Sequence, residues 1–203
     1  MADTSFLTEP PEDEATRRLY EGDLSSDGYI GNTTRLWCWR PDTAEAFTAL
    51  RGSLTRGSSL TDRELAVLVT ATAAERGDSY CALAWGSRLA RLVDDETAAN
   101  VLAGASTPRL TDREAALADW TRRVVRDPNA TTAADVDELR KRGLDDREIF
   151  EATTLVALRL AFATVNDALG AAPDRELAQE APERVRVAVT WGRVPSGGLS
   201  EDP

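Results

Sequence analysis

The most chemically promising residue of this chain is Cys81, in the run Asp78-Ser79-Tyr80-Cys81 where a helix is predicted to begin. If Asp78 caps that helix, Cys81 is its third residue, where a free backbone N–H and the helix dipole favour a thiolate. The negative charge of Asp78 and burial among apolar neighbours favour the neutral thiol instead. Two opposed effects therefore act on the thiol pKa, and a buried, unreactive cysteine is the alternative interpretation.

The chain has no histidine. This excludes Ser-His-Asp and Cys-His activation of a nucleophile, histidine-ligated zinc and an imidazole base at neutral pH. Any proton transfer must use carboxylates, tyrosines, a thiol or water. We expect no metal and no cofactor.

Composition limits the partners. The 203 residues include 24 basic and 35 acidic side chains, a net charge of −11 that would repel nucleic acid and anionic membrane surfaces. No apolar run approaches the roughly 20 residues that span a bilayer, and the start lacks the features of a signal peptide. We expect a cytoplasmic protein whose two cysteines, Cys38 and Cys81, stay reduced.

A repeated phrase marks the helices that must position this cysteine. Each copy places a capping residue three positions before a glutamate, which is the capping box at a helix start. The copies are Leu60-Thr61-Asp62-Arg63-Glu64, Leu110-Thr111-Asp112-Arg113-Glu114 and Leu144-Asp145-Asp146-Arg147-Glu148. The repetition suggests two related helical units, although a good helix start explains the residues equally well.

Apolar spacing after these caps is helical, and the longest predicted helix runs from about Asp146 to Leu169, ended by Gly170. Its apolar face is predicted to include Phe150 and Val165. Residues 185–191 alternate like a strand, and Asp42 or Thr43 is expected to cap an earlier helix. We predict an acidic flexible arm over 1–18, a helical domain over 19–172 and a C-terminal extension over 173–203.

The run from Glu75 to Gly86, preceded by the Arg63-Glu64 helix, resembles the core of the carboxymuconolactone decarboxylase and alkylhydroperoxidase D-like family. That core has a glutamate-bearing helix, a C-x-x-C at the next helix start and a histidine four residues after the second cysteine. The likeness covers roughly 28–170 and is closest to the peroxidase-related members. It implies an all-α fold with two related halves, assembly as a dimer, trimer or hexamer, and peroxide reduction coupled to a thiol reductant protein.

The chain departs from the family pattern at two positions. Asp78 occupies the first cysteine position, and Trp85 occupies the histidine position. Glu64 is the counterpart of the relay glutamate, but its spacing to Cys81 is about two residues too long, so Glu75 competes for that role. What remains is a one-cysteine variant of the family site.

The resemblance implies an alkylhydroperoxidase in which Cys81 attacks the peroxide, and Glu64 or Glu75 protonates the leaving alkoxide through water. Cys38 or an external thiol would resolve the sulfenic acid. Asp78, Tyr80 and Trp85 are expected to line the substrate pocket. The alternatives are lactone or small-acid chemistry with carboxylates, as in a carboxymuconolactone decarboxylase, and a binding or scaffold member without chemistry.

Overall fold

The computed structural model describes residues 5–197, and all the regular structure in that range is helical. The longer helices are α1 (Glu14–Ser26), α3 (Pro41–Thr55), α4 (Asp62–Arg76), α5 (Ser79–Leu92), α6 (Asp95–Leu102), α7 (Asp112–Arg126), α8 (Ala133–Lys141) and α9 (Asp146–Ala168). The shorter ones are α2 (Asn32–Trp37), the 3₁₀ turn η1 (Pro128–Ala130), α10 (Arg175–Glu180) and α11 (Glu183–Ala188). The all-α prediction is confirmed.

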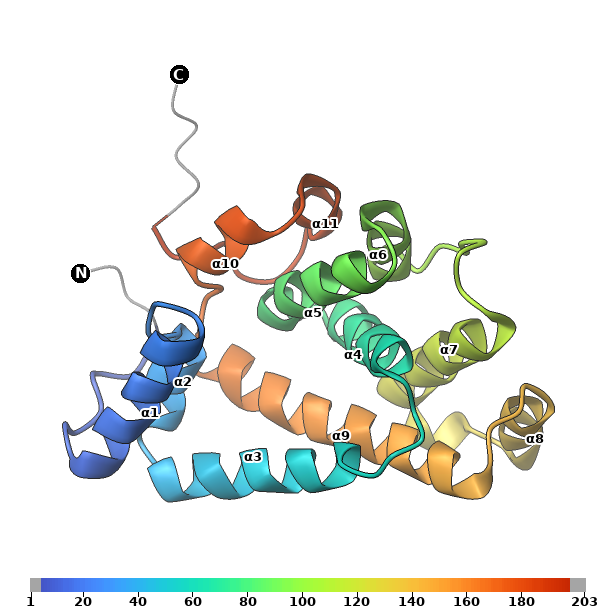
Figure 1. Cartoon of the computed structure of the whole chain (residues 1–203), viewed down its shortest axis with the longest axis horizontal. Coiled ribbons are helices and arrows are strands. Elements are labelled where there is room, and N and C mark those ends of the chain that lie inside the picture. Colours follow the sequence, from blue (N-terminus) through green and yellow to red (C-terminus); the bar gives the residue numbers. More distant parts are fainter. Residues whose placement is uncertain (1–4, 198–203) are drawn as a thin grey trace.

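Helix α4 lies at the centre of the molecule and packs against α5, α6, α7 and α9 (Figure 1). Its middle is apolar on every side, because Ala66, Val67, Leu68 and Val69 are each at most 1% exposed. One core cluster joins α4 to α5, α6 and α11, and a second joins it to α7, α8 and α9. None of the helices in the described part of the chain is both long and apolar enough to cross a bilayer.

The three predicted capping boxes are confirmed at the starts of α4, α7 and α9. In each, the cap side chain accepts the backbone N–H of the glutamate three residues on, and that glutamate accepts the N–H of the cap. The distances from the backbone N to Oε2 are 2.7 Å for Thr61 to Glu64, 2.8 Å for Thr111 to Glu114 and 2.9 Å for Asp145 to Glu148.

The same motifs also join the three helices to one another. Arg63 of α4 donates to both oxygens of Glu114 on α7, at 2.8 and 3.0 Å. Arg113 of α7 donates back to Glu64 and, at 2.8 Å, to Glu148 of α9. We call these five side chains the capping network. Its three carboxylates are each at most 8% exposed, and each is paired with an arginine rather than isolated.

The turn between α4 and α5 places Cys81. Gly77, with φ of 78°, takes the left-handed conformation that ends α4. The next residue, Asp78, caps α5, and its Oδ1 accepts the Cys81 backbone N–H at 3.0 Å. The prediction that Cys81 is the third residue of a helix capped by Asp78 is confirmed.

The predicted end of the long helix is nearly right, but its predicted buried face is wrong in part. Helix α9 ends at Ala168, two residues before Gly170. Phe150 is 67% exposed and Val165 is 37% exposed, whereas Ala152, Leu155 and Val156 are buried. Apolar residues surround most of this helix, so its contacts with α3, α4, α7 and α8 decide which face is covered.

Three further local predictions need correction. Residues 183–188 form the helix α11, not part of a strand, because a helix buries Val185 completely against α5 and α6. Helix α3 begins at Pro41 after Arg40, since proline suits the first turn, and neither Asp42 nor Thr43 is its cap. Helix α1 begins at Glu14, inside the segment predicted to be a flexible arm.

Candidate functional site

Cys81 lies beside a small internal cavity at the junction of α4, α5 and α9. The thiol residue is only 5% exposed. The cavity measures about 10 Å³, which is room for roughly one water molecule. Its lining consists of Val69, Thr72, Ala73, Arg76, Asp78, Cys81, Arg159 and Ala163. We call this space the thiol cavity.

The environment of Cys81 favours the neutral thiol. Burial raises the pKa of Cys81 well above its usual value, and the charge of Asp78 raises it further. The positive charge of Arg159 acts in the opposite direction, toward the thiolate. Of the two opposed effects expected from the sequence, burial and the neighbouring carboxylate therefore outweigh the helix terminus.

Arg159 is the principal cation at this site. It comes from α9, and its guanidinium carbon lies 4.5 Å from the centre of the Trp85 ring, whose other cationic neighbour is Arg88 at 5.0 Å. Burial lowers the pKa of Arg159 to about 10. Within the described range, 5–197, its Nε atom is buried without a hydrogen-bond partner, and so is Oδ2 of Asp78. Each is a polar atom that the protein leaves unsatisfied in the lining of the thiol cavity.

A second carboxylate lies close to this cluster. Burial raises the pKa of Asp167 to about 6, and the charge of Asp78 contributes to the increase. Asp167 is 3.9 Å from the guanidinium of Arg76, which is the exposed member of the cavity lining. Asp167 therefore gains and loses its proton at a pH close to neutral.

The two glutamates proposed as relays do not line the thiol cavity. Glu64 is held in the capping network by Thr61 and Arg113. Glu75 accepts from Arg126 of α7 at 3.0 Å. The structure thus assigns both carboxylates to ion pairs between helices, and their catalytic role stays a prediction without a contact to Cys81.

The other predicted site residues are divided. Asp78 lines the thiol cavity, and Trp85 packs under Arg159. Tyr80 donates its hydroxyl to Oδ2 of Asp174 at 2.5 Å and does not line the cavity. Cys38 is buried with a free thiol, and burial raises its pKa to about 11. Its function as a resolving thiol stays a prediction.

Sequence reasoning missed Arg159 and Asp167 as neighbours of the thiol. A signal for Arg159 was present, because it follows the buried Val156 by three residues and so lies on the same side of α9. A long cation on the buried face of an apolar helix indicates either a buried ion pair or a functional site.

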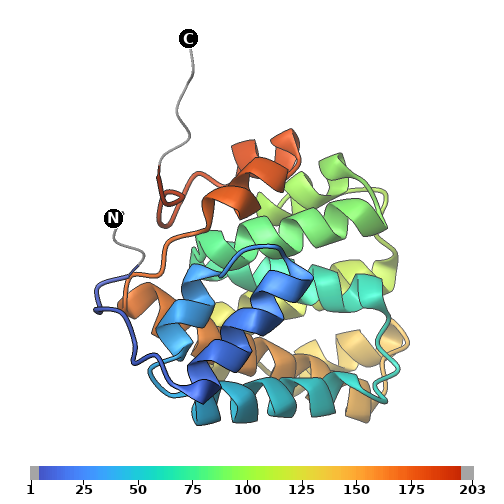
Figure 2. The same cartoon turned by 60° about the vertical axis from the view of Figure 1, so that its left-hand side comes forward.

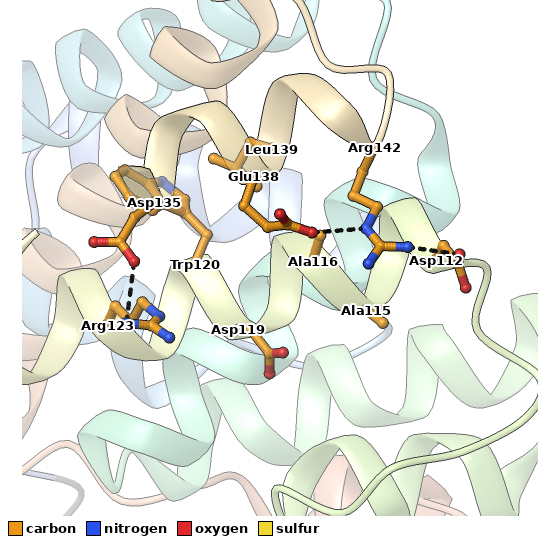
Figure 3. Close-up of a pocket in the computed structure, with 10 residues that line it drawn as sticks. All are labelled: Asp112, Ala115, Ala116, Asp119, Trp120, Arg123, Asp135, Glu138, Leu139 and Arg142. Atoms are coloured by element: carbon orange, nitrogen blue, oxygen red, sulfur yellow. Dashed lines mark hydrogen bonds and ion pairs between the residues drawn. The ribbon is translucent and has the colours of Figure 1, made fainter. Parts of the chain in front are cut away.

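A larger pocket lies between α7 and α8, and five of its charged groups are paired with one another (Figure 3), whereas Asp119 pairs with Arg122 outside the lining. Arg142 contacts Asp112 at 2.7 Å and Glu138 at 3.1 Å, and Arg123 contacts Asp135 at 3.2 Å. These ion pairs connect the ends of the two helices. The thiol cavity, although smaller, is the place where unpaired polar atoms and a nucleophilic group meet.

Comparison with known proteins identifies the fold. No family model matches the sequence, and no curated protein matches it. Among solved structures, an uncharacterized peroxidase-related protein with an alkylhydroperoxidase AhpD core from Ralstonia eutropha JMP134 is 22% identical, with a TM-score of 0.76 over 87% of this chain and 96% of that one. A peroxidase-related protein from Silicibacter sp. TM1040 is 21% identical, with a TM-score of 0.77 over 86% and 94%.

A third similar structure is a debrominase, Bmp8, as a cysteine-to-alanine variant in complex with 2,3,4-tribromopyrrole. It is 14% identical, with a TM-score of 0.71 over 89% of this chain and 97% of that one. At these identities the likeness establishes the fold alone. The chain is therefore an all-helical protein with the fold of the alkylhydroperoxidase AhpD core.

Proposed function

We propose that the protein is a thiol-dependent peroxidase in which Cys81 is the nucleophile, Asp78 accepts its proton and Arg159 stabilises the anion. The observation that carries this proposal is the grouping of these three residues around one cavity, with an unsatisfied polar atom on each of the two partners. Peroxidase-related proteins with the same fold add support.

The proposed reaction begins with transfer of the Cys81 proton to Asp78. The sulfur attacks the distal oxygen of a hydroperoxide, the O–O bond breaks, and the sulfur becomes a sulfenic acid. The proton held by Asp78 passes to the leaving alkoxide, which departs as an alcohol, or as water if the substrate is hydrogen peroxide. Arg159 stabilises negative charge first on the sulfur and then on the leaving oxygen.

Regeneration of Cys81 uses an external thiol in this proposal. The first thiol condenses with the sulfenic acid and releases water, and a second thiol reduces the mixed disulfide. Cys38 is the less suitable partner, because burial raises its pKa to about 11 and little of it is thiolate at neutral pH. A substrate larger than water must displace part of the cavity lining. We propose that it enters past Arg76, the exposed residue of that lining.

Chemical trapping of the sulfenic acid tests the proposal. The protein is treated with hydrogen peroxide, then with a dimedone-type probe, and the labelled peptides are identified by mass spectrometry. We expect label on Cys81 and none on Cys38, which serves as the buried thiol control, and no label in Cys81→Ser. An unlabelled Cys81 under conditions that label a peroxidase of known activity would rule the proposal out.

The Asp78→Asn variant isolates the proton acceptor. Asparagine is an equally good helix cap, so α5 is retained. Loss of the carboxylate charge lowers the Cys81 pKa, which thiolate absorbance would measure. We expect the rate of peroxide reaction to fall nevertheless, because the base is gone. A rate that rises with the thiolate fraction would assign Asp78 a purely structural role.

The second candidate function is ligand binding without thiol chemistry. It is favoured by the nearly sealed, neutral Cys81 and by the ion pairs of Glu64 and Glu75, which also weaken the carboxylate-based lactone chemistry considered from the sequence. An unlabelled Cys81 in the trapping experiment, combined with thermal stabilisation of the protein by a ligand that undergoes no reaction, would support this function.

A further inference from the structure

A further pocket of about 290 Å³ lies between α1, α2, α3 and α9. Figure 2 turns α1 and α2 toward the viewer, with α3 beneath them and α9 behind. The lining consists of Leu19, Asp23, Thr33, Thr34, Trp37, Ala44, Phe47, Thr48, Arg51 and Phe162. We call this space the aromatic pocket.

Three aromatic rings contribute to the wall of the aromatic pocket. The centres of the Trp37 and Phe162 rings are 5.4 Å apart at 17°, and those of Phe47 and Phe162 are 6.2 Å apart at 16°. Trp37 is also fixed by its N–H, which donates to Oδ1 of Asn166 at 2.8 Å. Rings held nearly parallel offer an apolar surface suited to another flat ring.

Arg51 supplies a cation at this surface. Its guanidinium carbon lies 5.4 Å from the centre of the Phe47 ring and 5.2 Å from that of Phe162. Its Nε atom is buried without a hydrogen-bond partner, and among the residues described here it forms no ion pair. Burial lowers the pKa of Arg51 below its ordinary value.

Within residues 5–197, Arg51 has no carboxylate partner, although the chain has 35 acidic residues, and its Nη2 donates only to Thr48 Oγ1, at 3.5 Å. The carboxylate that lines the same pocket, Asp23, instead accepts the backbone N–H of Gly31 at 3.0 Å. A guanidinium has five donors arranged to match a carboxylate, and a buried one without that partner retains unused binding capacity. The pocket therefore combines an apolar wall for a ring with an unoccupied donor for an anion.

The aromatic pocket is next to the thiol site. Phe162 lies one helical turn from Arg159 on α9, and Ala163, which follows it, lines the thiol cavity. Arg51 is close enough to affect the protonation of Arg159, lowering its pKa, while the charge on Cys81 acts on both arginines. A ligand in the aromatic pocket would thus lie beside the reactive group without depending on its chemistry.

We propose that the aromatic pocket binds a small planar aromatic carboxylate, with its ring against Trp37, Phe47 and Phe162 and its carboxylate paired with Arg51. The binding requires no reaction at Cys81. The amide of the same aromatic acid has nearly the same shape but no charge, and it therefore measures the contribution of the ion pair.

The experiment compares 2-naphthoate with 2-naphthamide by isothermal titration calorimetry. In the wild-type protein we expect 2-naphthoate to bind about ten-fold tighter or more, as a charge-assisted pair at a buried donor allows. In Arg51→Gln the ratio of the two dissociation constants should fall to about one. Arg56→Gln removes the same charge from the exposed end of α3 and should keep the wild-type ratio.

Equal wild-type affinities, no binding of 2-naphthoate, or an unchanged ratio in Arg51→Gln would each overturn the proposal. Nuclear Overhauser contacts between naphthoate and the rings of Trp37 and Phe162 locate the ligand in the wild-type protein, so the result holds even if a variant fails to fold. The absence of these contacts also counts against the pocket. Repeating the titration in Cys81→Ser, where binding should persist, separates this proposal from the peroxidase activity.

Discussion

The capping network and the thiol cavity both combine arginines with buried carboxylates, but they satisfy these groups differently. In the capping network, Arg63 meets both oxygens of Glu114, and Arg113 connects Glu64 with Glu148. In the thiol cavity, Nε of Arg159 and Oδ2 of Asp78 have no hydrogen-bond partner among the residues that the structure describes. Buried charges that are fully paired hold helices together, whereas unsatisfied ones are available to a substrate.

The largest expected effect comes from breaking the capping network at Arg113. Arg113→Ala leaves Glu64 and Glu148 as buried carboxylates without their shared cation, and we expect a loss of about 3 kcal/mol in the free energy of unfolding. Urea denaturation measures it. Arg140→Ala, which removes an exposed arginine paired with exposed Asp137 and Asp146, should change little. Equal effects of the two variants would show that the network is not structural.

A smaller effect of opposite sign is expected at Arg159. Arg159 forms no ion pair with any of the residues 5–197, so its replacement by an uncharged side chain in Arg159→Met removes a desolvation cost. Unfolding should then require the same free energy or about 1–2 kcal/mol more. The Cys81 pKa should rise, because the Arg159 charge lowers it. Denaturation and thiolate absorbance report the two quantities.

Arg88→Met serves as the matched control for that prediction. Arg88 lies over the same Trp85 ring but is exposed and paired with Asp62. The Arg88→Met substitution should leave the Cys81 pKa almost unchanged. A loss of stability greater in Arg159→Met than in this control would mean that Arg159 is held by contacts that outweigh its desolvation.

The smallest expected effect is the pH dependence of Asp167. Burial raises its pKa from 3.8 to about 6, so its protonated form contributes stability that is complete below pH 3.8 and lost as the pH rises through about 6. Asp167→Asn imitates the protonated form. After allowance for partial solvent screening, it should exceed the wild type by roughly 1 kcal/mol at pH 7 and match it near pH 4.

Urea denaturation at both pH values checks this expectation, with the exposed Asp95→Asn as a control that should show no such trend. A difference between Asp167→Asn and wild type that stays constant from pH 4 to pH 7 would contradict the assigned titration.

Short-range patterns were reliable guides to local structure. The three capping boxes, the Asp78 cap and the position of Cys81 in the first turn of α5 each depend on residues within three or four positions of one another. The order of the helices after Pro41 and the all-α fold follow largely from such starts and from helical spacing. The segment at 185–191 was misjudged because alternation in a short run fits a strand as well as a helix whose partner is distant.

The sequence by itself thus determined where most helices begin and that Cys81 is presented at a helix start without histidine or a second nearby cysteine. Only the tertiary structure decided the protonation of that thiol, because burial and the contact with Asp78 depend on how α4, α5 and α9 pack. It also brought Arg159 and Arg51 from different helices toward the same thiol, while ion pairs took Glu64 and Glu75 elsewhere. Electrostatic interactions act between groups that are close in space. The spacing of residues within one helix does not specify which residues of other helices will lie close to it.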